Sequence, residues 1–153
     1  MSSSETGPIL LCYDRSDGAR HAIATAGAFF PGRKAIVLHI WSPIAVAVAA
    51  YGGLMPLPDY DDSELETVAR EVADEGAGLA KAAGLEATAE IAEGTYEGTW
   101  HAIVTTADAR GAALIVIGAR GLSTFKSFML GSVSHGVAQH ARRPVLVVPP
   151  AAG

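Results

Sequence analysis

The sequence contains five short apolar runs, separated by longer stretches in which apolar residues recur at helical spacing. The runs are continuous rather than alternating, which is typical of strands in a parallel sheet that has helices on both faces. The pattern therefore predicts a β-α-β-α-β-α-β-α-β chain with right-handed connections. The predicted strands are residues 9–13, 35–40, 86–92, 113–117 and 144–148.

The helical stretches have defined ends and an apolar side. The first begins after Ser16, which is able to cap it, carries Asp17 in its first turn, and stops at the Pro-Gly pair 31–32. The Gly-Ala-Gly sequence 76–78 falls inside the second helix, where we interpret it as a packing feature. The apolar residues that mark the helices are Ala19, Ala22, Ile23, Ala26 and Phe30 on one side of the first, then Leu65, Val68, Ala69, Val72, Leu79 and Ala83 at helical spacing, then Trp100, Ile103, Val104 and Ala107. In the last helix, Val133, Val137 and Ala138 are predicted to face inward.

Length and composition exclude several classes of protein. At about 100–200 residues per domain, 153 residues make one domain, and we expect a flexible segment 1–7 followed by a single domain over 8–150. Half of the residues are hydrophobic (50%) and only 18% are charged, which excludes intrinsic disorder. The net charge of −5 lacks the basic excess of a general nucleic-acid binder, so no nucleic-acid partner is predicted.

Cysteine usage and the terminal segment indicate a cytoplasmic protein. Cys12 is the single cysteine, so no intramolecular disulfide can form, and its apolar neighbours favour a buried small hydrophobe over a thiol nucleophile. Residues 1–8 lack the features of a secretory signal, and the apolar stretch 44–57 is shorter than the about 20 residues that span a bilayer. No membrane contact is therefore expected. The Ala-rich composition, with more Arg than Lys, favours a bacterial source.

The segment that follows the fourth predicted strand indicates an anion site. Ligands of parallel sheets bind at the carboxyl ends of the strands, where the strand order reverses. Glycines let the backbone approach a phosphate closely and adopt positive φ, and free N–H groups at a helix start favour negative charge. Taken singly, each glycine also fits a simple turn. The residues concerned are Gly118, Arg120, Gly121, Lys126, Gly131 and Ser132.

Their spacing, Gly-x2-Gly-x9-Gly-Ser, resembles the nucleotide-binding signature of universal stress proteins. Asp14-Arg15-Ser16 is similar to the family's D-x-S after strand one, and Leu38-His39-Ile40 to its hydrophobic-His-hydrophobic end of strand two. Residues 114–148 follow the family pattern as well, so the resemblance covers nearly the whole chain. It implies a Rossmann-like α/β fold, an open five-stranded parallel sheet of order 3-2-1-4-5 with helices on both faces.

The resemblance also implies a ligand, because members with this glycine pattern bind ATP or related adenine nucleotides, with Mg²⁺ accompanying the triphosphate. Asp14 would then contact the adenosine part, Cys12 would supply the strand-one contact, and the backbone of Ile40 would face the adenine ring. Ile117 and Gly118 would lie under the ribose and phosphates. The implied phosphate contacts are Gly121, Gly131, Ser132 and Val133, with Arg120 as a cation in the same loop.

Some positions leave alternatives open. Arg15 stands where the family often has glycine or another small residue, and it could reach the phosphates or point to solvent. The loop after strand three is not expected to touch the nucleotide, and His39 is interpreted as structural or near the adenine edge. In segment 41–60, a lid over the nucleotide and packing on the subunit surface are equally favoured. The residues concerned there are Trp41, Tyr51, Leu54 and Met55.

These features favour a nucleotide-dependent stress-response or regulatory module that is not an enzyme. Residues 118–132 contain no Gln, Glu or Asp to orient water, so we expect ATP hydrolysis to be slow at most. One alternative is a dimeric interaction module that binds AMP, cyclic AMP or no nucleotide. An adenylyl-transferring enzyme is disfavoured because the chain lacks H-x-G-H and S-G-G-x-D-[ST]. A protein-ligand metal site is not predicted, since H-E-x-x-H and C-x-x-C are missing.

The last predicted strand also indicates self-association. As an edge strand it would expose apolar side chains and unpaired backbone groups. Pairing of Val145 to Val148 with the same strand of a second subunit would remove this exposure. The resemblance implies a homodimer of this kind.

Overall fold

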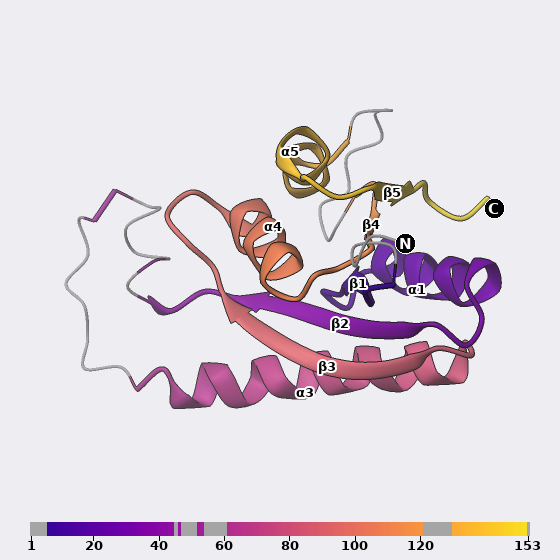
Figure 1. Ribbon diagram of the computed structural model, residues 1–153. Coiled ribbons are helices and arrows are strands. Elements are labelled where there is room, and N and C mark those ends of the chain that lie inside the picture. Colours follow the sequence, from indigo (N-terminus) through magenta and orange to yellow (C-terminus); the bar gives the residue numbers. More distant parts are fainter. Residues whose placement is uncertain (1–5, 45, 47–51, 54–60, 121–129, 153) are drawn as a thin grey trace.

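A computed structural model of the chain describes residues 6–44, 46, 52–53, 61–120 and 130–152 (Figure 1). The predicted flexible segment 1–7 lies outside them apart from its last two residues. In chain order, the strands and helices are β1 (Ile9–Cys12), α1 (Asp17–Phe29), β2 (Lys34–Trp41), α3 (Ser63–Ala82), β3 (Glu86–Glu93), α4 (Thr99–Ala109), β4 (Leu114–Gly118), α5 (Ser132–His140) and β5 (Val145–Val148).

The strands form one parallel sheet in the order β3-β2-β1-β4-β5, so the predicted fold and strand order are confirmed. Helices α1 and α3 cover one face, while α4 and α5 cover the other (Figure 1). The chain moves outward from β1 through β2 to β3, then returns to β4 on the other side of β1. The switch point of the sheet, where ligands of such folds bind, therefore lies between β1 and β4.

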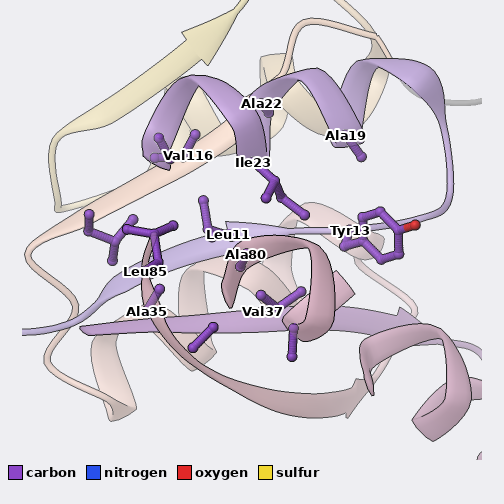
Figure 2. Close-up of a cluster of buried hydrophobic side chains, with 14 of the residues drawn as sticks. Leu11, Tyr13, Ala19, Ala22, Ile23, Ala35, Val37, Ala80, Leu85 and Val116 are labelled. Atoms are coloured by element: carbon purple, nitrogen blue, oxygen red, sulfur yellow. The ribbon is translucent and has the colours of Figure 1, made fainter. Parts of the chain in front are cut away.

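The core consists of two apolar layers, one on each face of the sheet. In β1, Ile9 and Leu11 pack in the layer under α1 and α3, whereas Leu10 packs in the layer under α4 and α5. All three side chains are at most 1% exposed, which explains why the strand is a continuous apolar run. Figure 2 shows the first layer, in which Ile23 of α1 and Val37 of β2 approach Leu11.

The larger apolar residues that indicated α3 do not form its buried face. Leu65, Val68 and Leu79 recur at helical spacing but are 39%, 50% and 37% exposed. The helix instead presents a stripe of mostly small side chains, which lets its backbone lie close to the sheet at the density typical of protein cores. The buried residues are Ala69, Val72, Ala73, Gly76, Ala77 and Ala80.

The two glycines of α3 have different environments. A Cβ atom on Gly76 would lie 2.6 Å from Cδ1 of Tyr13 and 2.7 Å from Cγ1 of Val37. The packing interpretation is therefore confirmed at Gly76. At Gly78, which is exposed, no described atom lies within 4 Å of the same position, so packing does not explain that residue.

The buried face of α5 matches the prediction at Val133 and Val137, which pack in the second layer. Ala138 is exposed rather than inward, and Gly136 is buried. A Cβ atom on Gly136 would lie 2.5 Å from Cγ of Trp100, so the glycine lets α5 approach the indole ring of α4. The Trp100 ring also stacks on the ring of His140, which lies on α5 as well, with ring centroids 4.2 Å apart.

The ends of the elements follow the local signals. The Ser16 hydroxyl accepts a hydrogen bond from the N–H of Ala19 at 3.1 Å, which confirms the predicted cap, and α1 ends at Phe29. Trp41 completes β2 and is buried, so its role is packing. Tyr51, Leu54 and Met55, the other residues considered for a lid, lie outside the described residues. In the described part of the chain, none of the helices is both long and apolar enough to span a bilayer.

Candidate functional site

A cavity of about 240 Å³ opens at the carboxyl ends of β1, β2 and β4, beside the switch point of the sheet. The starts of α1, α4 and α5 converge on it as well. Its volume is just below the about 300–1,000 Å³ of typical small-molecule sites. The lining residues are Cys12, Tyr13, Asp14, Ser16, Ala19, Leu38, His39, Ile40, Thr99, Ile103, Ile117, Gly118, Arg120, Gly131, Ser132, Val133 and Ser134.

The structure brings nearly all of the predicted site residues together around this cavity. Gly121 and Lys126 lie outside the described residues. Residues that are more than 100 positions apart in the chain thus line one cavity, because the loops that follow parallel strands lie at the same edge of the sheet. The predicted residues in the lining are Cys12, Asp14, Ile40, Ile117, Gly118, Arg120, Gly131, Ser132 and Val133.

The lining of the cavity combines apolar and polar groups. Its apolar residues include Leu38, Ile103 and Ile117. Gly131 and the cation Arg120 belong to the same lining. This arrangement suits a ligand with a flat or apolar part joined to an anionic group.

The start of α5 presents backbone donors to the cavity. Gly131 occupies the N-cap position and, having no side chain, makes no capping hydrogen bond. Within the described residues, the N–H groups of the next three residues find no acceptor. Helix α1 begins at the same cavity but is capped by Ser16. The uncapped α5 terminus is therefore the feature of the site that is best suited to an anion, since its free N–H groups and its dipole both favour negative charge.

Gly118 and Gly131 do not adopt the positive φ that the sequence led us to expect. Gly131 has φ −61°, and Gly118 is not among the glycines in the left-handed region. A Cβ atom on Gly118 would lie 3.0 Å from the backbone of Gly18, so this glycine permits close approach of α1. On Gly131, it would meet its nearest described atom, the Ala119 carbonyl oxygen, at 3.4 Å. Neither φ nor packing by the described residues thus requires glycine at 131.

The segment that joins β1 to α1 is held by local hydrogen bonds. Asp14 Oδ1 accepts the N–H of Ser16 at 3.0 Å, which fixes the carboxylate in an Asx turn. The Tyr13 carbonyl oxygen lies 2.9 Å from Nδ1 of His39. Because a carbonyl only accepts, Nδ1 carries the proton and Nε2 is the acceptor nitrogen of the neutral ring. His39 lines the cavity and also supports the loop.

Arg15 is exposed, which agrees with the second of the two positions considered from the sequence. Its guanidinium Nε donates to Oε2 of Glu75 on α3 at 2.8 Å, and Arg15 does not line the cavity. Its φ of 66° lies in the left-handed region, which costs a side-chain-bearing residue about 1–2 kcal/mol. This backbone conformation explains why glycine suits the position.

The Glu75 carboxylate accepts hydrogen bonds from three side chains. Oε1 accepts from the Tyr13 hydroxyl at 2.6 Å and from Arg20 at 3.3 Å, and Oε2 accepts from Arg15. The hydrogen bond from Tyr13 is the main cause that lowers the pKa of Glu75, and the two arginines act in the same direction. Burial, followed by the hydrogen bond to Glu75, raises the pKa of Tyr13 to about 12.

The lowered pKa of Glu75 predicts a dependence of stability on acid. A carboxylate whose pKa is lower in the folded state stabilises the protein above its unfolded pKa, and the contribution is lost as pH falls through the folded pKa. We expect Glu75→Gln to destabilise the protein at pH 7 and to have a smaller effect below the ordinary value of 4.5. Urea unfolding of both proteins at pH 7 and pH 4 measures this. An equal effect at the two pH values would contradict it.

Cys12 lines the cavity, but its surroundings disfavour the reactive thiolate form. Burial, with a smaller contribution from the charge of Asp14, raises the pKa of Cys12 to about 12. Cys12 is half-buried and packs against the second core layer, so its interpretation as a buried small hydrophobe is confirmed only in part. We expect iodoacetamide at pH 8 to alkylate the native protein about 1,000-fold more slowly than the urea-unfolded chain, because the thiolate is the nucleophile. Mass spectrometry reports this directly, since the chain has one cysteine, and comparable rates in both states would contradict it.

Several lining residues were not predicted. Thr99 and Ile103 reach the cavity from the first turns of α4, although the loop after β3 was set aside in the sequence analysis. The available signal was the position of α4, which starts at the carboxyl edge of the sheet. The other lining residues that were not named as ligand contacts are Tyr13, Ser16, Ala19 and Leu38.

Comparisons with known proteins agree with this architecture. A protein from Bacillus subtilis, universal stress protein YxiE, is 32% identical over 149 residues, covering 92% of this chain and 97% of that protein. A universal stress protein crystallised in complex with cAMP has a TM-score of 0.67 at 24% identity, covering 96% of this chain and 99% of that one. An Arabidopsis thaliana family member with AMP bound has a TM-score of 0.61 at 14% identity, covering 95% and 93%.

The sequence profile of the universal stress protein family matches residues 5–149, nearly the whole chain. The match includes every described strand and helix. The chain therefore belongs to the universal stress protein family.

Proposed function

We propose that the cavity binds an adenine nucleotide, with ATP as the preferred ligand, and that the protein acts as a nucleotide-dependent stress-response module. The observation that carries the proposal is the uncapped start of α5 at Gly131, which lines one cavity together with apolar residues such as Ile103 and Ile117. Free N–H groups at a helix start are a general phosphate-binding arrangement.

The proposal assigns a role to each part of the lining. The adenosine part would lie along Cys12, Asp14 and Ile40, with Ile117 and Gly118 under the ribose and first phosphate. The phosphates would accept from the backbone at the start of α5 and from the Ser132 hydroxyl.

Mg²⁺ would be held mainly by the phosphates. Asp14 is the single carboxylate among the described lining residues. Magnesium commonly binds through substrate phosphates, water and only one or two carboxylates, so this donor set fits the ion together with a nucleotide. It does not form a separate metal cage.

The glycine at 131 is compatible with the proposal. Its φ is ordinary, and a Cβ atom would meet the described protein atoms only at contact distance. The missing side chain leaves the backbone open to close approach of a ligand.

A second candidate is a regulatory module that binds a monophosphate. The similar structures that hold cAMP and AMP favour it, because both ligands have the adenosine part and one phosphate. In both candidates we infer binding without rapid turnover. The Asp14 carboxylate is engaged by the Ser16 N–H, and no other described lining residue is a carboxylate or glutamine able to orient an attacking water.

Titration calorimetry with ATP, AMP and cyclic AMP tests the two candidates. The protein is first unfolded and refolded to remove copurified nucleotide, and Mg²⁺ is present throughout. Tightest binding of ATP supports the first candidate, and tighter binding of AMP or cyclic AMP supports the second. The absence of binding of all three to the folded protein would overturn the proposed function.

We also propose that two copies of the chain pair through β5 and that the protein works in the cytoplasm. β5 lies at an edge of the sheet, and Val145, Leu146 and Val147 are only partly buried. An edge with apolar side chains is favourably covered by an identical strand. Sedimentation equilibrium is expected to give twice the chain mass of 15.7 kDa, and a monomer at micromolar concentration would contradict the dimer.

A further inference from the structure

The loop of residues 13–16, called here the site loop, gives three of its four residues to the cavity. Tyr13, Asp14 and Ser16 line the cavity, whereas Arg15 does not. Arg15 carries the left-handed backbone conformation, with φ 66°, and it is the one described non-glycine residue with positive φ. The shape of the cavity wall thus depends on a backbone conformation that arginine does not favour.

A carboxylate on another helix holds this loop from outside. Glu75 of α3 accepts from the Tyr13 hydroxyl at 2.6 Å and from Arg15 Nε at 2.8 Å, so it joins the two residues of the site loop that flank Asp14. Arg20 of α1 completes the arrangement, because it donates to Glu75 at 3.3 Å and also to the carbonyl oxygen of Arg15. The charged groups around the Glu75 carboxylate are thus the two guanidinium groups.

The contact between α3 and the loop is close. Gly76, the next residue after Glu75, lets the helix pack directly on the ring of Tyr13. The ring is buried in the layer between α3 and the sheet, and its hydroxyl oxygen points away from the other labelled side chains of that layer (Figure 2). The close packing of α3 on the ring thus brings the Glu75 carboxylate within hydrogen-bond distance of the Tyr13 hydroxyl.

We propose that Glu75 is a positioning residue of the nucleotide site, which holds Arg15 in the left-handed conformation and thereby presents Asp14 to the ligand. The inference rests on the proposed function for its ligand. In this chain, a charged pair between Arg15 and Glu75 takes over what a glycine at position 15 would do unaided.

The test compares ATP affinity, measured by calorimetry, among four variants. Glu75→Ala is expected to weaken binding by about 5- to 30-fold, the factor that corresponds to the cost of a left-handed residue. Glu71→Ala is the matched control, because Glu71 lies one turn earlier on α3, is exposed, and has no ion pair among the described residues. The ATP affinity of Glu71→Ala is expected to match that of the unmodified protein.

Arg15→Gly separates positioning from general stability. Glycine adopts the left-handed conformation without cost, so Arg15→Gly alone is expected to bind ATP as the unmodified protein does. In the double variant, Glu75→Ala is expected to weaken binding less than 2-fold, about as little as the spread of independent sites. If Glu75 only stabilised the fold, Arg15→Gly would not restore affinity, and that result would overturn the proposal.

A second readout needs no nucleotide. The Ser16 amide donates to Asp14 Oδ1 in the site loop, so its NMR chemical shift and hydrogen exchange report the loop conformation. We expect a changed shift and faster exchange in Glu75→Ala, and none in Glu71→Ala. Failure of the unmodified protein to bind any adenine nucleotide would reject the proposed function, while an unchanged Ser16 amide in Glu75→Ala would reject the positioning role.

Discussion

Replacing Gly131 with valine is expected to weaken ATP binding by about 100-fold or more, because two or more charge-assisted hydrogen bonds of about 1.5–3 kcal/mol each would be lost. The added side chain would occupy the space at the start of α5 where the phosphates are proposed to approach the backbone. The fold should tolerate the change, since Gly131 has φ −61° and ψ 160°, which valine adopts readily. Calorimetry on nucleotide-free protein measures the effect.

The control for this variant is Gly78→Val. Gly78 is exposed on α3, and no described atom lies within 4 Å of its Cβ position. The affinity of Gly78→Val for ATP is expected to equal that of the unmodified protein. Unchanged affinity in Gly131→Val would contradict the role of the α5 terminus, whereas loss of affinity together with loss of the folded circular dichroism spectrum would mean that the glycine is structural.

Two identical substitutions in α3, Gly76→Ala and Gly78→Ala, are expected to change stability in opposite directions. At Gly78 alanine removes the entropic penalty of a helical glycine and should stabilise the protein by about 0.5–1 kcal/mol. At Gly76 the new methyl would lie 2.6 Å from the Tyr13 ring and 2.7 Å from Val37. Such overpacking costs about 1–3 kcal/mol, which exceeds the gain in helix propensity.

Urea unfolding at one pH compares the two variants, and their free energies of unfolding are expected to differ by about 2 kcal/mol. The contact with Tyr13 extends the prediction to the site, because Tyr13 lines the cavity. Gly76→Ala is therefore also expected to weaken ATP binding, and Gly78→Ala is not. Equal stabilisation by both substitutions would show that α3 can move away from the sheet without cost.

Local features of the sequence were sufficient for the fold class. Ser16 caps α1 as predicted, because a cap depends on residues three positions apart. The strands were recognisable as continuous apolar runs, since both faces of β1 and β4 are buried. The strand order came from the resemblance rather than from periodicity, and the structure confirms it.

The inner faces of the helices were less predictable. Hydrophobic spacing favoured Leu65, Val68 and Leu79 of α3, but the sheet accepts the neighbouring small residues and leaves these three exposed. Periodicity identifies an apolar helix and does not report how closely it must approach its neighbour. That distance depends on the side chains of the opposing strands and on the Tyr13 ring.

By itself, the sequence determined a parallel α/β domain and the stretch from Gly118 to Ser132 as its candidate anion site, because capping, strand runs and the glycine spacing are properties of neighbouring residues. Only the tertiary structure decided that Arg15 pairs with Glu75 and that α4 contributes Thr99 and Ile103 to the cavity. Arg15 and Glu75 are 60 residues apart, and no local pattern connects them. They meet because the order of strands places α3 beside the end of β1, where the left-handed turn at Arg15 needs a partner.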